Sequence, residues 1–190
     1  MKILAFDRQP SSEYNPPVGV DIMPDCAIIK DGKPFFLPPF SENWSYYAAP
    51  AFRVCRLGKH IGRKFASRYI DAFTIALITR PVDALELYSG MPYGVLNSYE
   101  GSIILGDWQP IPDDYPDAVI KAGDTEVTID AFKKDAEALD SIIEHVSGIC
   151  TMKIGDIIAA SRIKLCDNVP IDTLITGDVG GKEVLSVRIK

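Results

Sequence analysis

The sequence contains no long apolar segment of the kind that crosses a membrane. None of its apolar runs approaches the ~18 residues of a spanning helix, and Asp7 and Arg8 interrupt the N-terminal run where a signal peptide would continue. We therefore expect a cytoplasmic protein. Its 190 residues, 47% hydrophobic and 24% charged, predict one globular domain over residues 1–190. The net charge of −6 disfavours nucleic acid and membrane as partners.

Several chemical motifs are also missing. The four cysteines show no CxxC spacing, so we interpret them as buried free thiols rather than as zinc ligands or disulfides. No G-x-G-x-x-G or P-loop is present, and no G-x-S-x-G turn supports a serine nucleophile. Of the two histidines, we expect a surface role for His60 and a helix C-terminal role for His145. Neither histidine therefore indicates catalysis.

Acidic residues are absent from residues 43–70, although the chain holds 26 of them. The same segment carries a cluster of six cations: Arg53, Arg56, Lys59, Arg63, Lys64 and Arg68. Two interpretations stay open. The cluster is either a solvated basic face that is balanced by acids elsewhere, or a surface for an anionic ligand or partner.

The hydrophobic patterns predict a β-rich chain with two helices. Asp-Gly and Gly-Asp pairs between apolar runs indicate hairpins over 26–38 and 119–129, and all four Gly-Asp pairs are interpreted as tight turns. Helical spacing of apolar residues predicts short amphipathic helices over 62–73 and 130–148. Further strands are expected over 51–57, 73–79, 102–108, 152–165 and 184–190. Since strands precede and follow each helix, the predicted class is α+β with a mostly antiparallel or mixed sheet.

Four blocks of the sequence resemble the fumarylacetoacetate hydrolase family. They read CAIIKDGKPFFLP, FRVCRLGKHI, KFASRYIDAFTIALITR and IIEHVSGICTMKIGDII, and they occur in the family's order. The match covers about residues 25–80 and 101–178. The resemblance implies a mixed β-sandwich roll that is usually dimeric. It also implies Mg²⁺- or Mn²⁺-dependent hydrolysis, decarboxylation, hydration or isomerisation of 2-oxo and dicarbonyl acids.

The positions that the resemblance assigns to the metal site carry no acid here. The family's Glu-x-Glu pair and its following Asp ligand fall on Tyr47, Ala49 and Ile78. A family Lys near the site falls on Met23, and an Arg after the third ligand falls on Val82. An aromatic ring, a methyl and a sec-butyl group cannot offset the dehydration of a divalent cation. We therefore expect no metal cofactor.

Two further family elements are altered. The family's Thr-Gly-Thr-Pro turn reads Ala-Ser-Arg-Ile over 160–163. The Pro-rich N-terminal segment, residues 1–24, is shortened and has no histidine over 8–15 that could belong to the family's His-Glu dyad. With neither ligands nor a general base in the motif, we predict a pseudoenzyme with a role in interaction or small-anion binding.

A relocated active site is the alternative, and it stays open. Asp71, Asp83 and Glu86 lie close in sequence to the lost Asp position. We expect Asp71 to be a surface or capping carboxylate at a helix end, and the other two to lie in a solvated loop. In the alternative, the chain is a divergent hydrolase, decarboxylase or isomerase of a 2-oxo or dicarbonyl acid, and Arg80 or Arg162 holds the substrate carboxylate.

The expected partners follow from the same resemblance. A pseudoenzyme of this family would form a homodimer or a heterodimer with an active relative. A small anionic ligand would contact Arg53, Arg80 or Arg162, which are the three arginines that we single out.

Overall fold

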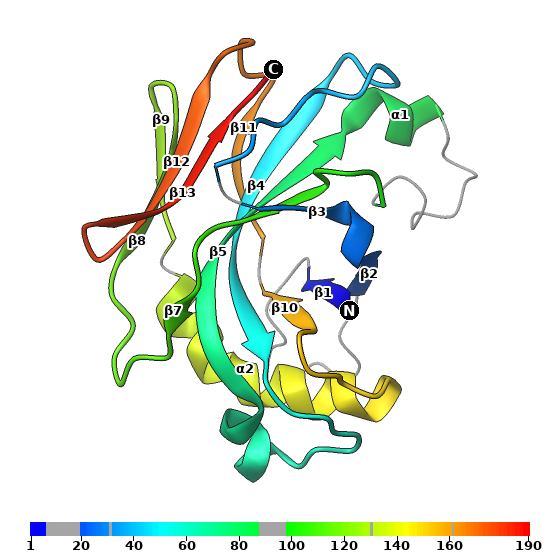
Figure 1. Cartoon of the computed structure of the whole chain (residues 1–190), viewed down its shortest axis with the longest axis vertical. Helices are drawn as coiled ribbons and strands as arrows, with labels where there is room; N and C mark the ends of the chain where they lie inside the picture. The colour runs from blue at the N-terminus through cyan, green and yellow to red at the C-terminus, as the bar shows by residue number, and fades with distance from the viewer. Residues whose placement is uncertain (7–19, 31, 88–97, 130, 161) are drawn as a thin grey trace.

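The computed structural model describes residues 1–6, 20–30, 32–87, 98–129, 131–160 and 162–190 (Figure 1). Its strands are β1 (Lys2–Phe6), β2 (Val20–Pro24), β3 (Ile28–Lys30), β4 (Trp44–Val54), β5 (Ile70–Pro81), β6 (Ile103–Leu105), β7 (Gln109–Pro110), β8 (Ala118–Ala122), β9 (Thr125–Thr128), β10 (Ile157–Ala159), β11 (Ile163–Asp167), β12 (Leu174–Val179) and β13 (Lys182–Arg188). Its helices are α1 (Val82–Leu87), α2 (Ala131–Ile149) and the 3-10 helices η1 (Asp25–Ala27) and η2 (Arg63–Tyr69). Within these ranges, no helix is long and apolar enough to cross a bilayer.

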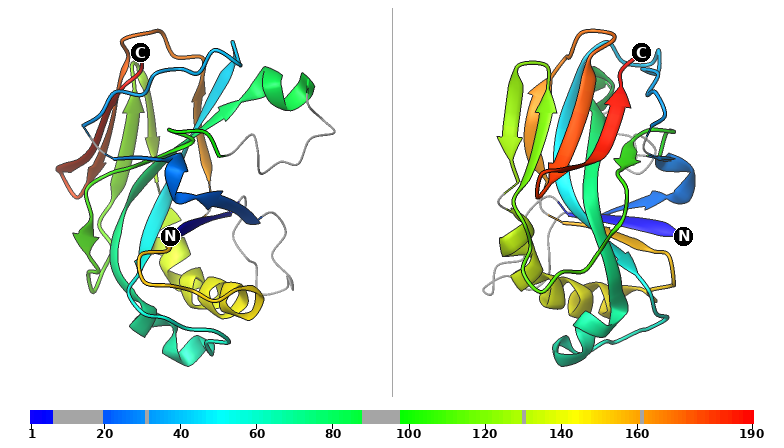
Figure 2. Two further views of the ribbon diagram at one scale, coloured as in Figure 1. Left: turned by 45° about the vertical axis from the view of Figure 1, so that its right-hand side comes forward. Right: turned by 60° about the vertical axis from the view of Figure 1, so that its left-hand side comes forward.

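Nine strands form one mixed sheet around the long antiparallel pair β4 and β5. The strand order is β2-β1-β10-β4-β5-β6-β3, with β11 also paired to β4 and β7 to β5. The pairs β1/β10 and β3/β6 are parallel. A second sheet has the order β13-β12-β8-β9 and lies on one side of β4 and β5, with α2 crossing below (Figures 1 and 2). The β-rich α+β class and the mixed sheet are thus confirmed.

The two faces of the nine-stranded sheet carry separate apolar clusters. On one face, Phe52 and Leu77 pack in a core that includes Ile175 of the four-stranded sheet and Ile142 of α2. The opposite face holds a smaller group without any member from the four-stranded sheet, which we call the far-face cluster. Its buried members are Ile3, Ala5, Met23, Ala27, Ala49, Ala51, Ala76, Ile78, Ile103, Leu105, Ile157 and Ala159.

Two of the local predictions agree closely with the structure. β8 and β9 form the hairpin expected over 119–129, with Gly123 at φ +56° in the turn. α2 covers almost the predicted range, and its stripe of Leu139, Ile142, Ile143 and Val146 is buried, as amphipathic spacing predicts.

The hairpin predicted over 26–38 is wrong. β3 pairs with β6 instead, and the residues beyond the turn run along β13. There the Phe35 amide donates to the Arg188 carbonyl at 2.9 Å, and the Leu37 amide donates to the Lys190 carbonyl at 2.8 Å. Phe35 is buried and packs edge-on against Trp44. Burial of this aromatic ring therefore outweighs the local preference for a hairpin.

The helix predicted over 62–73 is shorter and of another type. η2 is a 3-10 helix that ends at Tyr69, and β5 begins at Ile70. Asp71 therefore lies in a strand rather than at a helix end. Conversely, Asp83 and Glu86 lie in α1 rather than in the expected loop.

Two smaller expectations also fail. Gly177 and Asp178 lie inside β12, at a shift in the pairing register with β13, so this Gly-Asp pair marks a β-bulge and not a turn. The four cysteines are free, as predicted, but Cys26 is exposed and the other three are only partly buried. The segment 8–15 and Ser161 of the altered turn lie outside the described residues.

Candidate functional site

The far-face cluster brings together four of the five positions at which the resemblance places lost site residues, and Val82 is not among its members. Met23, Ala49 and Ile78 are buried members of the cluster, and the half-buried Tyr47 packs against it. They come from β2, β4 and β5, which are far apart in sequence. The strand pairing explains the convergence, because Tyr47 lies directly opposite Ile78, and Ala49 lies opposite Ala76 next to it.

The apolar character of these positions does not fit a divalent cation. Ala49 and Ile78 have no exposed surface, and Met23 is 1% exposed. Mg²⁺ and Mn²⁺ take oxygen ligands, which none of these three side chains offers. Among the described residues, no group of three or more Asp, Glu, His or Cys side chains could hold a metal elsewhere. The described residues therefore offer no ligand set that matches the metal implied by the resemblance.

One end of the same face is charged. Asp21 lies two residues before Met23 on β2, and Arg80 lies two residues after Ile78 on β5, so both share the face of the far-face cluster. Arg80 Nη2 lies 2.5 Å from Asp21 Oδ2, and Arg162 Nη1 lies 3.3 Å from the same oxygen. We call Asp21, Arg80 and Arg162 the charged triad.

Burial distinguishes the charged triad from a surface ion pair. The side chains of Arg80 and Arg162 are 5% and 6% exposed, and that of Asp21 is 15% exposed. A buried guanidinium needs an acceptor because leaving it unpaired away from water is strongly unfavourable. The carboxylate of Asp21 is therefore shared by two cations, which fixes β2, β5 and the start of β11 together.

The third predicted anion contact lies elsewhere. Arg53 is partly exposed near the other end of β4, where its Nε donates to Asp71 Oδ1 at 2.8 Å and its Nη2 donates to Oδ2 at 3.1 Å. This hydrogen bonding raises the pKa of Arg53. Its guanidinium also stacks 5.5 Å from the centre of the Trp108 ring. The structure thus unites Arg80 with Arg162 and separates both from Arg53.

Two of the three acids considered for a relocated site, Asp71 and Asp83, have structural roles. Asp71 is the surface partner of Arg53. Asp83 accepts hydrogen bonds from the Ser41 hydroxyl and from the amides of Glu42 at 2.8 Å and Asn43 at 3.3 Å. These bonds lower the pKa of Asp83 to about 2. Asp83 therefore fixes the loop before β4, and the side chain of Glu86 lies outside the described residues.

The histidines do not join these groups. His60 is exposed and adopts φ +53°, and its amide donates to the Ser147 carbonyl at 2.9 Å. His145 lies within α2, and its Nε2 is buried without a hydrogen-bond partner among the described residues. Burial lowers the pKa of His145, so its neutral form is favoured.

Asp21 is the site residue that sequence reasoning missed. The signal was available, because strand periodicity places Asp21 and Met23 on one face once β2 is recognised as a strand. The partners of Asp21 could not be predicted from the sequence, because Arg80 and Arg162 follow 59 and 141 residues later.

Comparison with solved structures identifies the fold. A fumarylpyruvate hydrolase from Pseudomonas aeruginosa, solved with Mn²⁺ and pyruvate, matches with a TM-score of 0.78 at 15% identity over 100% of this chain and 89% of that one. A 5-carboxymethyl-2-hydroxymuconate delta-isomerase from Mycobacterium smegmatis matches with a TM-score of 0.78 at 18% identity over 99% and 76%. A protein from Yersinia pestis, named for the fumarylacetoacetate hydrolase family, matches with a TM-score of 0.80 at 16% identity over 100% of this chain and 92% of that one.

The chain therefore has the fold of the fumarylacetoacetate hydrolase family, as the resemblance predicted. Proteins with this fold include hydrolases and isomerases. No family model and no curated protein matches the sequence.

Proposed function

We propose that this protein keeps the fumarylacetoacetate hydrolase fold without the metal-dependent catalysis and acts through binding. The observation that carries the proposal is the packing of Tyr47, Ala49, Ile78 and Met23 in the far-face cluster. At the positions that the resemblance assigns, a phenol and three apolar side chains take the place of three carboxylates and an ammonium. The protein would then work in the cytoplasm as a homodimer, or as a partner of an active relative.

The direct test is metal binding by the purified protein. A ligand that binds only the native state must raise the melting temperature. We expect no shift with Mg²⁺ or Mn²⁺, and no turnover of oxaloacetate or an acylpyruvate, whereas the Pseudomonas fumarylpyruvate hydrolase serves as positive control. A metal-dependent shift together with turnover that a chelator abolishes would overturn the proposal and favour the relocated active site.

Restoring the carboxylates tests the alignment itself. In the variant Tyr47→Glu/Ala49→Glu/Ile78→Asp, Mn²⁺ should raise the melting temperature, because it neutralises acids that are otherwise unfavourable in an apolar cluster. The matched control replaces Ala49→Glu by Ala51→Glu, since Ala51 is equally buried two residues along the same face. Equal responses of the two variants would show that position 49 is not a ligand position.

Binding of a small carboxylate at the charged triad is the second candidate. It is supported by the convergence of Arg80 and Arg162, since paired guanidinium groups suit bidentate recognition of a carboxylate. Titration with pyruvate by calorimetry tests it, with Arg162→Gln as the variant and Arg53→Gln as the control. Binding that survives Arg162→Gln unchanged, or no binding by the wild type, would exclude this candidate.

A further inference from the structure

A second surface of the molecule combines exposed apolar side chains with exposed cations. It lies where β4 passes into η2, at the lower end of the molecule in Figure 1, beside the turn that follows α2. Four large apolar side chains are exposed there: Leu57 at 67%, Phe65 at 40%, Ile149 at 63% and Ile154 at 72%. Five exposed cations accompany them: Arg56, Lys59, Lys64, Arg68 and Lys153. We call these nine residues the basic end.

Hydrogen bonds join three separate segments into the basic end. Gly58 and Met152 exchange backbone bonds of 3.0 and 2.8 Å, which places the turn after α2 beside the residues that follow β4. On the other side, the Cys55 amide donates to the Tyr69 carbonyl at 2.8 Å, which attaches η2. The three segments therefore lie side by side, although Leu57 and Ile154 are 97 residues apart.

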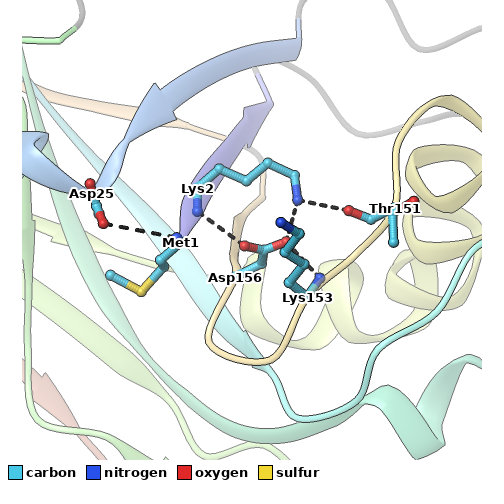
Figure 3. A network of polar contacts seen from close by, with 6 residues as sticks. All are labelled: Met1, Lys2, Asp25, Thr151, Lys153 and Asp156. Atoms are coloured by element: carbon cyan, nitrogen blue, oxygen red, sulfur yellow. Dashed lines mark hydrogen bonds and ion pairs between the residues drawn. The ribbon is translucent and has the colours of Figure 1, made fainter.

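The turn that carries Lys153 and Ile154 is held by hydrogen bonds to Asp156 and Lys2, and Figure 3 shows Lys2, Lys153 and Asp156 side by side. The carboxylate of Asp156, 1% exposed, accepts the Lys153 amide at 2.8 Å, the Lys2 amide at 3.0 Å and the Lys2 ammonium. The Lys2 ammonium also donates to the Thr151 carbonyl at 2.9 Å. These bonds use the Lys153 amide and leave the exposed side chains of Lys153 and Ile154 available to a partner.

The charges of the basic end are not neutralised within the described protein. None of its five cations forms an ion pair with a described residue, whereas Arg53 and Arg63, from the same acid-free segment, pair with Asp71 and Glu144. Lys64 and Arg68 instead lie 4.8 and 5.1 Å from the centre of the Phe65 ring. Phe65 is thereby presented between two cations in a chain whose net charge is −6.

We propose that the basic end attaches this protein reversibly to an anionic phospholipid surface. Cations near such a surface are attracted by its headgroups, and neighbouring apolar side chains can enter the boundary of the acyl layer. The apolar side chains lie on three separate segments of the chain, and a fluid surface accommodates such points without a complementary shape. The acidic remainder of the chain is repelled, so only this end faces the lipid.

This inference revises the expectation that a membrane is not a partner, which rested on the net charge of the whole chain. The average charge conceals the local excess of cations in the acid-free segment, to which the turn after α2 adds Lys153 and Ile154. The inference is independent of the metal question, because none of its residues belongs to the far-face cluster or the charged triad.

Vesicle co-sedimentation tests the proposal with the full chain. We expect the protein to pellet with phosphatidylcholine vesicles that contain phosphatidylserine and not with phosphatidylcholine alone, and added salt should weaken the binding. Lys64→Glu/Arg68→Glu should lower the affinity at least about tenfold. The control Lys33→Glu/Lys182→Glu changes the net charge equally at exposed sites outside the basic end and should have little effect.

A second pair of variants separates apolar insertion from charge. Ile154→Asp should reduce vesicle binding several-fold, whereas Ile171→Asp, at a side chain 58% exposed outside the basic end, should reduce it little. No binding to phosphatidylserine vesicles, or equal losses in a variant and its control, would overturn the proposal. Binding to polyglutamate as strong as binding to vesicles, with no effect of Ile154→Asp, would overturn it in favour of an acidic polypeptide partner.

Discussion

The charged triad and the basic end differ in whether their cations are buried and paired with a carboxylate. In the charged triad, two arginines that are 5% and 6% exposed share the carboxylate of Asp21. At the basic end, five exposed cations have no acidic partner among the described residues. Burial explains the difference, because a charge away from water must be paired while a hydrated one need not be. The free energy of unfolding should therefore depend on the charged triad, and binding to a lipid surface should depend on the basic end.

The largest effect is expected from Asp21→Asn. It removes the charge shared by two buried guanidinium groups, and breaking a buried ion pair typically costs about 3–5 kcal/mol. The measurement is the free energy of unfolding in urea. Asp71→Asn is the matched control: it breaks the partly exposed pair with Arg53 and should cost at most about 1 kcal/mol. Equal losses would contradict the distinction between the two kinds of pair.

A smaller loss is expected from Ala49→Leu. Because Ala49 is fully buried in the far-face cluster, the added isopropyl group should overpack the cluster and lower the free energy of unfolding by about 1–3 kcal/mol. Ser67→Leu, on the exposed surface of η2, should change it by less than about 0.5 kcal/mol. A neutral or stabilising Ala49→Leu would indicate free space where the cluster is described as packed.

Tyr46→Phe should stabilise the protein by about 1 kcal/mol, because a buried polar group without a partner is unfavourable. The Tyr46 hydroxyl is buried with no hydrogen-bond partner among the described residues, and burial raises its pKa. Tyr99→Phe is the opposite case, since the Tyr99 hydroxyl donates to the Thr79 carbonyl at 2.9 Å. Thermal unfolding should show a higher melting temperature for Tyr46→Phe and a lower one for Tyr99→Phe. A lower melting temperature in both variants would contradict the conclusion that the Tyr46 hydroxyl has no partner among the described residues.

The smallest effect on stability is expected at the basic end. Lys64→Glu/Arg68→Glu removes only exposed contacts with the Phe65 ring, so the free energy of unfolding should change by at most about 1 kcal/mol. The same urea experiment measures it. A loss as large as that of Asp21→Asn would mean that these cations support the fold, and any change in vesicle binding could then not be assigned to contact with lipid.

Local patterns in the sequence were sufficient to predict an element when that element forms within one continuous segment. The hairpin β8/β9 and the helix α2 were predicted almost to the residue, because turn geometry and helical spacing act within one segment. The prediction of a hairpin over 26–38 was wrong because Phe35 is buried in a core that also contains Trp44 and Ile189. The helix over 62–73 failed because Ile70 onward pairs with β4.

The sequence by itself determined the composition of the far-face cluster and of most of the basic end: apolar residues where the resemblance places a metal site, and a run of cations without acids. The tertiary structure decided which other residues these side chains contact. Pairing of β4 with β5 joins Tyr47 to Ile78, a shared carboxylate joins Arg80 to Arg162, and the Gly58–Met152 contact adds Ile154 to the basic end. Such contacts depend on how the whole sheet closes, and a local pattern of side chains does not contain that information.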